Sequence, residues 1–360
     1  MQTADFDFQL PSELIGQRPS PERGKSKLLV LDRKQNRMEH KLFSDVPDFL
    51  RRGDVLVLND SRVIPARLRG RNARTGGRFE FLLLEENEVN DWWAMVRPGK
   101  NARIGTKILF GQVNTSPGQA SVSAIVLEKN AGGHCRLRFS GLEDIKEFLD
   151  VEGEVPLPPY IAREGEGQQP EDRERYQTVF ARYDGSVAAP TAGLHFTKDL
   201  LDEIRRAGVT VCFVTLHVGP GTFLPVKTSD LSEHTMHEER FVLGEETVRA
   251  VNAAKKSGAR VFAAGTTTVR VLESMAARSA GKLNVYAGKT NIFIFPPYEF
   301  KIVDALITNF HLPRSTLLML ASAFASPGET RGREMMLRAY AEAIRERYRF
   351  YSYGDAMLIL

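Results

Sequence analysis

The sequence predicts a mixed α/β fold, in which a larger layered domain with a mixed sheet carries a smaller, inserted antiparallel β-barrel. Short β-type runs broken by Gly, Asn and Pro dominate the first half, and no convincing helix lies between residues 62 and 142. The second half alternates helices with strands, as layered sheets with parallel pairing do. We therefore expect residues 1–61 and 152–360 to form the larger domain and residues 62–151 to form the barrel.

The β-type runs of the first half are short and closely spaced, which is typical of small barrels and sandwiches. Strands are predicted at 28–32, 53–60, 78–85, 92–99, 107–111, 121–128 and 135–141. A polar segment rich in Pro and Gly follows at 151–177, although its VPLPPYI stretch is too apolar for a free linker. We expect this segment to cross between the two domains.

The second half contains the predicted helices. They cover 196–208, 245–258, 266–279, 315–325 and 332–348. Strands are predicted between and after them, at 209–218, 260–265, 291–295, 301–309 and 355–360. The first helix shows its ends most clearly, since Thr197 is a suitable N-cap and Gly208 a suitable stop.

Composition restricts the class of protein. The hydrophobic content of 42% and the charged content of 26% are ordinary for a soluble globular protein. No apolar run approaches the roughly 18 residues of a membrane span, and the acidic N-terminal segment does not resemble a secretory signal. Cys135 and Cys212 are too few for a Cys-rich zinc site. We expect a cytoplasmic protein with no membrane partner.

Basic residues are clustered in one segment, although the net charge of +4 is mild. Six arginines and no acidic residue occur between positions 62 and 78; this arginine stripe comprises Arg62, Arg67, Arg69, Arg71, Arg74 and Arg78. Arginine forms paired hydrogen bonds to phosphate oxygens, so the stripe suits a polyanion. The alternative is a solvated strand face whose arginines pair with acidic residues elsewhere.

A strand-to-helix junction carries the first candidate binding loop. Gly265 permits a tight turn, and Thr266, Thr267 and Thr268 then lead into a helix. Free backbone N–H groups and hydroxyls at a helix start suit an anion. The segment lacks both G-x-G-x-x-G and the P-loop lysine, so neither a dinucleotide nor a nucleoside triphosphate is indicated. Simple N-capping by a threonine is the alternative.

Histidines mark two further loops. The segment SVAAPTAGLHFT, 186–197, places His195 after a run of small residues. The segment LHVGPGTF places His217 at a strand exit, before Gly219 and Gly221. Glycines allow a ligand to approach the backbone, although histidines at strand exits are often structural.

Polar residues leave apolar strands at two other points. Asn309 and His311 follow a strand and precede a helix, which fits either a pocket wall or an ordinary connecting loop. Asp60 and Arg62 lie where the chain enters the predicted barrel, and a buried salt bridge that fixes this crossing is the alternative.

A metal site is the weakest of the hypotheses. His234, His237 and Glu238 lie close together, but the H-E-x-x-H spacing is absent and no carboxylate completes a ligand set. We expect no metal; a metal hydrolase would require metal in the purified protein.

Seven longer strings resemble one family, the S-adenosylmethionine:tRNA ribosyltransferase-isomerases, and they occur in order along the whole chain. They are VLVLNDSRVIPARL, YQTVFARYDGSVAAPTAGLHFT, LHVGPGTFLPV, HTMHEE, GTTTVRVLES, ITNFHLPRSTLLML and YRFYSYGDAMLI. The resemblance implies a larger mixed α/β domain with a smaller β-barrel insertion. It also implies a bacterial, cytoplasmic enzyme of queuosine biosynthesis.

The activity implied by the resemblance is an unusual use of S-adenosylmethionine. Its ribosyl part is transferred to 7-aminomethyl-7-deazaguanine at the wobble position of a tRNA with a GUN anticodon. Adenine and methionine leave, and epoxyqueuosine results. No metal or separate cofactor is expected, since S-adenosylmethionine is consumed as a substrate. We expect a monomer; a tRNA-binding protein without catalysis, on the same fold, is the alternative function.

This chemistry needs a base, an acid for the departing adenine, and contacts to both substrates. Histidine suits the first two roles, and the candidates are His195, His217 and His311. The expected substrate-binding residues are Asp60, Arg62, Thr191, Gly193, Gly219, Gly221, Thr222, Thr266, Thr267, Thr268 and Asn309. The residues expected to hold tRNA phosphates are Arg67, Arg69, Arg71, Arg74 and Arg78. Phe196 or Phe223 could stack on a base, although both also fit a core.

Overall fold

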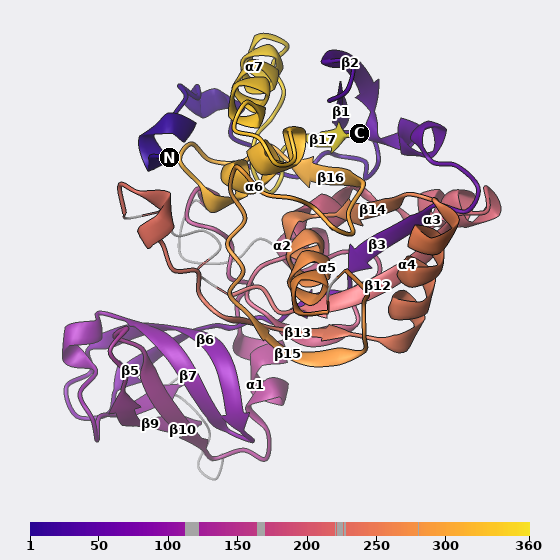
Figure 1. The fold of residues 1–360 in the computed structure, drawn as a ribbon. Coiled ribbons are helices and arrows are strands. Elements are labelled where there is room, and N and C mark those ends of the chain that lie inside the picture. The colour runs from indigo at the N-terminus through magenta and orange to yellow at the C-terminus, as the bar shows by residue number, and fades with distance from the viewer. Residues whose placement is uncertain (112–121, 164–169, 220, 222–225, 227, 280) are drawn as a thin grey trace.

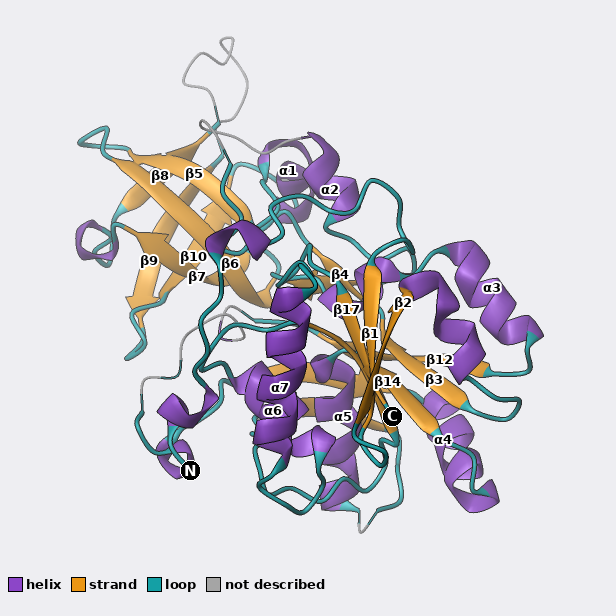
Figure 2. Ribbon diagram, turned by 90° about the horizontal axis from the view of Figure 1, so that it is seen from above, coloured by secondary structure: helices purple, strands orange, loops and turns teal. Residues whose placement is uncertain are grey.

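The computed structural model describes residues 1–111, 122–163, 170–219, 221, 226, 228–279 and 281–360. Its two main β structures are a nine-stranded mixed sheet and a closed six-stranded antiparallel barrel, so the predicted fold class is confirmed. The barrel lies to one side of the large sheet (Figures 1 and 2). A two-stranded parallel pair, β4 (Ser61–Val63) with β11 (Tyr183–Ser186), forms where the chain leaves the sheet for the barrel.

The large sheet has the strand order β15-β13-β12-β3-β14-β16-β17-β1-β2. Its strands are β1 (Lys27–Asp32), β2 (Arg37–Leu42), β3 (Val55–Asn59), β12 (Thr210–Leu216), β13 (Glu239–Leu243), β14 (Val261–Ala264), β15 (Tyr286–Thr290), β16 (Ala305–Asn309) and β17 (Ala356–Ile359). The central four, β12, β3, β14 and β16, are parallel neighbours. Antiparallel strands complete the β13–β15 edge.

Helices cover both faces of this sheet. They are α3 (Lys198–Arg206), α4 (Glu245–Ser257), α5 (Thr266–Arg278), α6 (Thr316–Ala325) and α7 (Gly332–Arg345), with short 3-10 turns η1 (Thr3–Phe6), η2 (Ser12–Leu14), η3 (Phe43–Phe49), η5 (Thr191–His195) and η7 (Leu231–Glu233). Every residue of β3 is buried. Val55 and Val57 pack with α4, α5 and α6, whereas Leu56 and Leu58 pack with α3. This alternation explains why a parallel strand buried on both faces is a continuous apolar run.

The barrel has the order β10-β7-β6-β5-β8-β9 and its own core. Its strands are β5 (Arg67–Asn72), β6 (Arg78–Glu88), β7 (Asp91–Arg97), β8 (Lys107–Phe110), β9 (Ser123–Lys129) and β10 (Cys135–Ser140), with the turn η4 (Gly99–Asn101) after β7. Two short helices, α1 (Ile145–Glu152) and α2 (Pro170–Arg175), follow the barrel strands. Phe79, Phe81 and Leu83 alternate along β6 and point into the barrel.

Some predicted boundaries were wrong. Residues 291–295 form no strand; Phe293 and Phe295 pack against the main core instead, and the neighbouring strand is β15. The predicted strand 301–309 is shorter, because residues before β16 form a loop, and α7 ends before residue 348. Within the described residues, no helix is long and apolar enough to cross a membrane.

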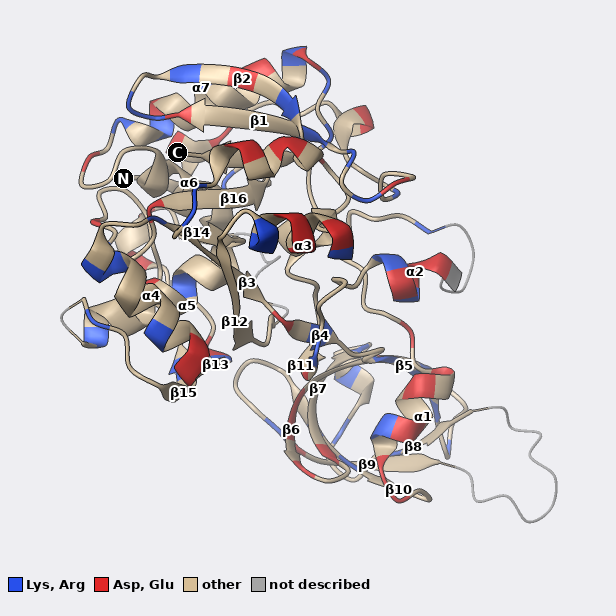
Figure 3. Cartoon of the chain, turned by 90° about the vertical axis from the view of Figure 1, so that its right-hand side faces the viewer, with Lys and Arg blue, Asp and Glu red and all other residues tan. Residues whose placement is uncertain are grey.

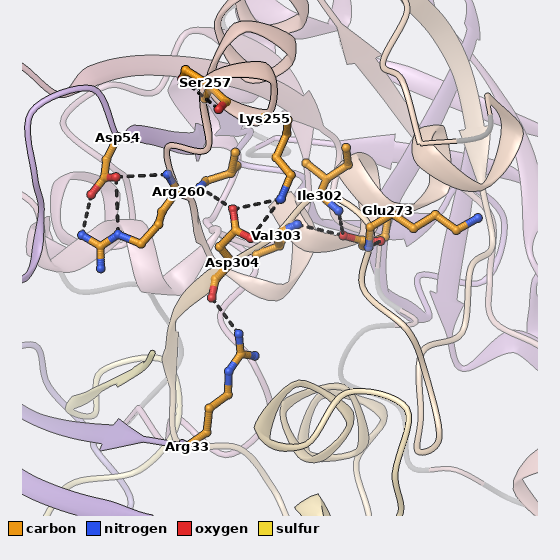
Figure 4. Close-up of polar contacts among 12 residues, drawn as sticks. Arg33, Asp54, Lys255, Ser257, Arg260, Glu273, Ile302, Val303 and Asp304 are labelled. Carbon is orange, nitrogen blue, oxygen red and sulfur yellow. Dashed lines mark hydrogen bonds and ion pairs between the residues drawn. The ribbon is translucent and has the colours of Figure 1, made fainter. Parts of the chain in front are cut away.

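Charged residues hold the amino ends of the central strands (Figure 4). Arg260, before β14, pairs with Asp54, before β3, at 2.6 Å, and Lys255 pairs with Asp304, before β16, at 2.9 Å. The buried carboxylate of Glu273 accepts the backbone N–H groups of residues 301–303. These contacts lie at the amino ends of the strands, opposite to their carboxyl ends.

Candidate active site

Four parallel strands end along one edge of the large sheet. Asn59 and Asn309 are the last residues of β3 and β16, while His217 and Gly265 directly follow β12 and β14. Ligands of open α/β sheets bind beyond the carboxyl ends of the strands. This edge is therefore the candidate active site, and it collects residues from several of the sequence motifs.

Asn59 links three elements at this edge. Its side-chain amide donates to the Leu216 carbonyl at 3.0 Å and to Oγ1 of Thr267 at 3.3 Å. Its Oδ1 accepts the backbone N–H groups of Leu216 and Ser61. Asn59 is 1% exposed, so these bonds replace those that water would make. It fixes the start of α5 against the end of β12; an asparagine inside a buried apolar strand was the available signal for this role.

His217 is held by a chain of hydroxyls. Nδ1 lies 2.9 Å from Oγ of Ser61, which lies 2.6 Å from Oγ of Ser186. The backbone N–H of Val218 donates to Ser186. Gly185 packs directly against the ring, and a side chain at this position would clash with it, since a Cβ would lie 2.8 Å from Nδ1. The ring therefore has one defined position, with Nδ1 turned towards the protein.

The protonation of His217 follows from its surroundings. Burial, with a smaller contribution from the positive charge of Arg240, lowers the pKa of His217 to about 4. The imidazole is therefore neutral near pH 7. In one assignment, the hydroxyl of Ser186 donates to Ser61 and the hydroxyl of Ser61 donates to Nδ1 of His217. Nδ1 is then an acceptor, so the proton of the neutral ring is on Nε2. If Nδ1 donates to Ser61 instead, Nε2 is left with a lone pair, so the ring can act as donor or acceptor.

The start of α5 is buried beside this network. Thr266, Thr267 and Thr268 are 6%, 7% and 0% exposed, and Thr268 donates back to the Ala264 carbonyl. Neither predicted threonine cap forms, because Gly265 occupies the N-cap position with φ +91°. The helix start lies against η5, since a Cβ on Gly265 would be 3.8 Å from that of Ala192.

His195 lies at this edge, but both ring nitrogens are engaged. Nδ1 is 2.6 Å from Oγ of Ser26, and Nε2 is 3.1 Å from the side-chain amide nitrogen of Asn309. The ring stacks on Phe43 at 4.9 Å between centroids. Burial, followed by the charges of Arg349 and Arg23, lowers the pKa of His195 to about 3. In this arrangement His195 and Asn309 connect η5 to β16.

His311 forms its hydrogen bonds with neither His217 nor His195. Its Nε2 lies 2.8 Å from Oγ1 of Thr308, and its backbone N–H donates to the hydroxyl of Tyr340. Burial lowers the pKa of His311 to about 3. The three candidate histidines thus have different hydrogen-bond partners, and of the three only His217 lines the large cavity described below, so the geometry favours His217 for contact with a ligand.

The glycines differ in what surrounds them. A Cβ on Gly193 would lie 2.9 Å from atoms of both Thr178 and Phe180, so protein packing already explains its missing side chain. A Cβ on Gly219 would approach only Glu239, at 4.0 Å. Gly221 lies against the ring of His237. Thr222, another expected substrate contact, lies outside the described residues.

The remaining predicted substrate contacts have different environments. Asp60 is buried, accepts the hydroxyl of Thr215 at 2.6 Å, and has its pKa raised by burial. Arg62 is exposed and lies 3.6 Å from Asp184, so Asp60 and Arg62 do not form the suggested buried salt bridge. Thr191 begins η5 and is partly exposed.

A cavity of about 850 Å³ lies between the barrel and the β13 edge of the sheet. His217, Gly219 and Gly221 line it from the sheet side, and Trp93 and Met95 line it from the barrel. Four of the seven histidines face it, namely His134, His217, His234 and His237. Its position beside the carboxyl edge makes it the space in which a substrate can meet His217.

The contribution of the barrel to this cavity was not predicted. His134, in the turn before β10, has its pKa lowered by burial and by His237. Burial and His237 likewise lower the pKa of His234. The positive charge that His237 can carry therefore disfavours protonation of both His134 and His234. Among the described residues, no three His, Cys, Asp or Glu side chains are arranged to hold a metal ion.

The arginine stripe lies mainly on the outer surface of the barrel (Figure 3). Arg67, Arg69 and Arg71 alternate with buried residues along β5, and Arg78 faces Arg71 across the strand pair. Arg74 is exposed in the β5–β6 turn. Arg69 pairs with Glu154 at 3.2 Å and Arg67 with Glu80 at 3.9 Å, in addition to the Arg62–Asp184 pair. Part of the alternative interpretation is therefore correct for this face.

Comparisons with known proteins agree on one family. A family model described as "Queuosine biosynthesis protein" matches residues 3–359. S-adenosylmethionine:tRNA ribosyltransferase-isomerases from Caldanaerobacter subterraneus subsp. tengcongensis and Clostridioides difficile are 48% and 47% identical to this chain, each over the full length of both proteins.

A solved structure supports the same assignment. The crystal structure of S-adenosylmethionine tRNA ribosyltransferase from Thermotoga maritima is 38% identical, covers 99% of this chain and 100% of its own, and superposes with a TM-score of 0.54. The likeness therefore extends from the sheet through the barrel. The chain belongs to the queuosine biosynthesis protein family of S-adenosylmethionine:tRNA ribosyltransferase-isomerases.

Proposed function

We propose that this chain transfers and isomerises the ribosyl part of S-adenosylmethionine onto 7-aminomethyl-7-deazaguanine at the tRNA wobble position. The observation that carries the proposal is identity near one half, over the full chain, to two proteins named for this activity. The substrate is a GUN-anticodon tRNA, and the products are epoxyqueuosine-tRNA, adenine and methionine. The enzyme acts in the cytoplasm, as a monomer and without a metal or separate cofactor.

The chemistry begins at the sulfonium of S-adenosylmethionine. The positive sulfur acidifies the C5′ hydrogens, so a neutral imidazole can remove one of them. Loss of adenine, which leaves with a proton, opens the ribose to a vinyl sulfonium. The amine of the tRNA base adds to C4′ of this species, which now carries an aldehyde at C1′, and the addition leaves a sulfur-stabilised carbanion at C5′. That carbanion adds to the C1′ aldehyde, which closes a five-membered carbocycle and leaves an alkoxide on C1′. The alkoxide then displaces methionine from C5′ and closes the epoxide.

His217 is the residue best suited to proton transfer in this scheme. It lines the cavity, it is neutral near pH 7, and its hydroxyl chain accommodates either ring tautomer. The N-terminal end of α5, with Thr266, Thr267 and Thr268, is the candidate for the methionine carboxylate. His195, Asn309 and His311 serve this proposal by holding η5 and the strand ends in place.

Adenine release tests the function directly. Purified protein is incubated with S-adenosylmethionine and a GUN-anticodon tRNA that carries the 7-aminomethyl-7-deazaguanine base. We expect adenine and methionine to form in equal amounts, and the tRNA to gain the ribosyl-derived group by mass spectrometry. The matched control is the same tRNA with an ordinary guanine. Binding of the modified tRNA without adenine release would instead support the non-catalytic alternative.

A further inference from the structure

The outer face of β5, β6 and β7 forms a continuous surface whose character changes along its length. Strand register places Arg71 opposite Arg78, and the next outward row contains Arg69, Glu80 and Arg97. The next row contains Arg67, Leu82 and Met95, and the row after it contains Glu85, Trp93 and Arg136. Arginines predominate at one end of the face, whereas the other end combines charged side chains with apolar residues and a tryptophan.

The two ends open into different hollows. A groove of about 620 Å³ on the barrel is lined by four arginines and three glutamates, namely Arg69, Arg71, Arg78, Arg97, Glu80, Glu152 and Glu154. Trp93 and Met95 line the cavity that also contains His217. Arg97 and Trp93 lie on the same side of β7, which places their Cα atoms roughly 13 Å apart at the rise of a strand. A chain of a few nucleotides can span this distance.

The basic end contains two arginines that an external anion can bind. Arg69 is not one of them, since it pairs with Glu154 at 3.2 Å. Arg71 and Arg97 are exposed and make no ion pair with any described residue. A phosphate backbone supplies the missing negative charge, and arginine binds phosphate oxygens through paired hydrogen bonds.

The aromatic end contains the outward member of a tryptophan pair. Trp92 is 3% exposed and points into the barrel core, whereas Trp93 is partly exposed at the cavity. Unpaired RNA bases stack on aromatic side chains, and each such stack contributes about 1–3 kcal/mol to binding. The aromatic residues suggested by sequence do not fill this role: Phe196 is fully buried, and Phe223 lies outside the described residues.

We propose that this barrel face is a track for unpaired RNA, on which Arg71 and Arg97 hold phosphates while Trp93 stacks on the wobble base in the cavity with His217. The inference rests on the proposed function, because it takes the wobble base as the nucleotide that reacts. It adds Arg97 and Trp93 to the residues expected to contact the RNA, and it states the direction in which the RNA runs. The RNA runs along the barrel towards the carboxyl edge of the sheet.

Tryptophan fluorescence tests the stack, because Trp92 and Trp93 are the two tryptophans of the chain. The Trp92→Phe variant leaves Trp93 as the reporter, and the Trp93→Phe variant leaves Trp92 as the matched control. Each is titrated with an RNA hairpin of the anticodon stem-loop sequence. We expect quenching in Trp92→Phe and in the wild type, and unchanged emission in Trp93→Phe. Should Trp92→Phe fail to fold, the difference between wild type and Trp93→Phe supplies the same measurement.

A second hairpin, with an abasic site at the wobble position, separates stacking from phosphate contacts. It keeps every phosphate, so we expect it to bind through the arginines without quenching Trp93. Trp93→Ala should bind the intact hairpin about 5- to 140-fold more weakly, with Trp93→Phe restoring much of the affinity. Quenching by the abasic hairpin, or equal affinity of Trp93→Ala and wild type, would overturn the proposal.

The outcome for the function is separate. Wild-type protein that releases adenine with modified tRNA, yet shows no Trp93 quenching, keeps the proposed function and loses the track. Wild-type protein that releases no adenine loses the proposed function, whatever the fluorescence shows.

Discussion

At the scale of single residues, the main distinction is between histidines that face a cavity and histidines that are buried in hydrogen bonds. His217 uses Nδ1 for the Ser61–Ser186 chain and lines the cavity. His195 uses both ring nitrogens within the protein. The same side chain thus lines a cavity in one place and holds two elements together in the other, and the sequence motifs alone do not separate these environments.

The His217 assignment predicts a graded series of variants. His217→Ala should lower the turnover of adenine release by roughly 10²-fold or more, because a positioned acid or base contributes at least that much. Ser61→Ala removes only the partner of Nδ1, so it should lower kcat by a smaller factor and leave the KM for S-adenosylmethionine nearly unchanged. Ser61→Thr keeps a hydroxyl and should recover part of the loss. Full turnover in His217→Ala would remove this residue from the mechanism.

The buried His311 predicts how stability depends on pH. Its pKa of about 3 in the folded chain lies below the ordinary 6.5, so the unfolded state binds the proton first. The contribution of His311 to the free energy of unfolding is therefore fully present above about pH 6.5. It decreases as the pH drops towards 3, by about 1 kcal/mol per pH unit. Chemical denaturation at several pH values measures the slope. His311→Gln should have a shallower slope, and parallel curves for variant and wild type would contradict the assignment.

At the scale of elements, strong periodic patterns were sufficient where burial is simple. The run VLVLN predicts β3 because both faces of that strand are covered. The predicted N-cap of α3 is confirmed, with Thr197 accepting from the N–H of Leu200, and Gly208 follows the helix with φ +84°. These elements depend on local chemistry and on a uniform environment, which a sequence pattern records directly.

Edge strands were harder to predict, because their pattern is weak. β15 has the sequence YAGKT, and it forms because β13 supplies a full antiparallel ladder beside it. The more apolar stretch that follows was chosen instead, and its aromatic residues pack as a loop on the core. Hydrophobicity indicates burial, whereas strand formation at an edge depends on the partner. That partner is distant in sequence.

The candidate site shows the same limit. Loops after parallel strands were identified from Gly, Thr and His residues, and the structure gathers Asp60, His217, Gly219 and the start of α5 at one edge. Ser61, Ser186 and Asn59 were not singled out, because their roles come from contacts across more than a hundred positions of sequence. Trp93 and His134 belong to the barrel, and tertiary structure alone brings them to the cavity.

At the scale of the whole molecule, the barrel is joined to the sheet by charge as well as by the chain. Glu85 of β6 lies 3.6 Å from Arg240 of β13 and 3.4 Å from Lys289 of β15. These contacts bridge the two sides of the cavity. In the proposed reaction, the barrel presents the RNA and the carboxyl edge of the sheet supplies His217, so both parts are needed.

This division of labour predicts a specific dependence on salt. Arg71→Gln with Arg97→Gln removes two exposed charges from the barrel groove, whereas Arg249→Gln with Lys256→Gln removes two from α4, which is distant from the barrel (Figure 1). If each groove arginine neutralises one phosphate, the first double variant should reduce the slope of log affinity against log salt by about 1.4 to 1.8.

Binding of the modified tRNA, measured across a salt series, gives the slope. The α4 double variant has the same net charge as the groove double variant. It should keep the wild-type slope, because its two substituted residues neutralise no phosphate in the complex. Equal slopes in both double variants would mean that net charge, and not the barrel groove, attracts the tRNA.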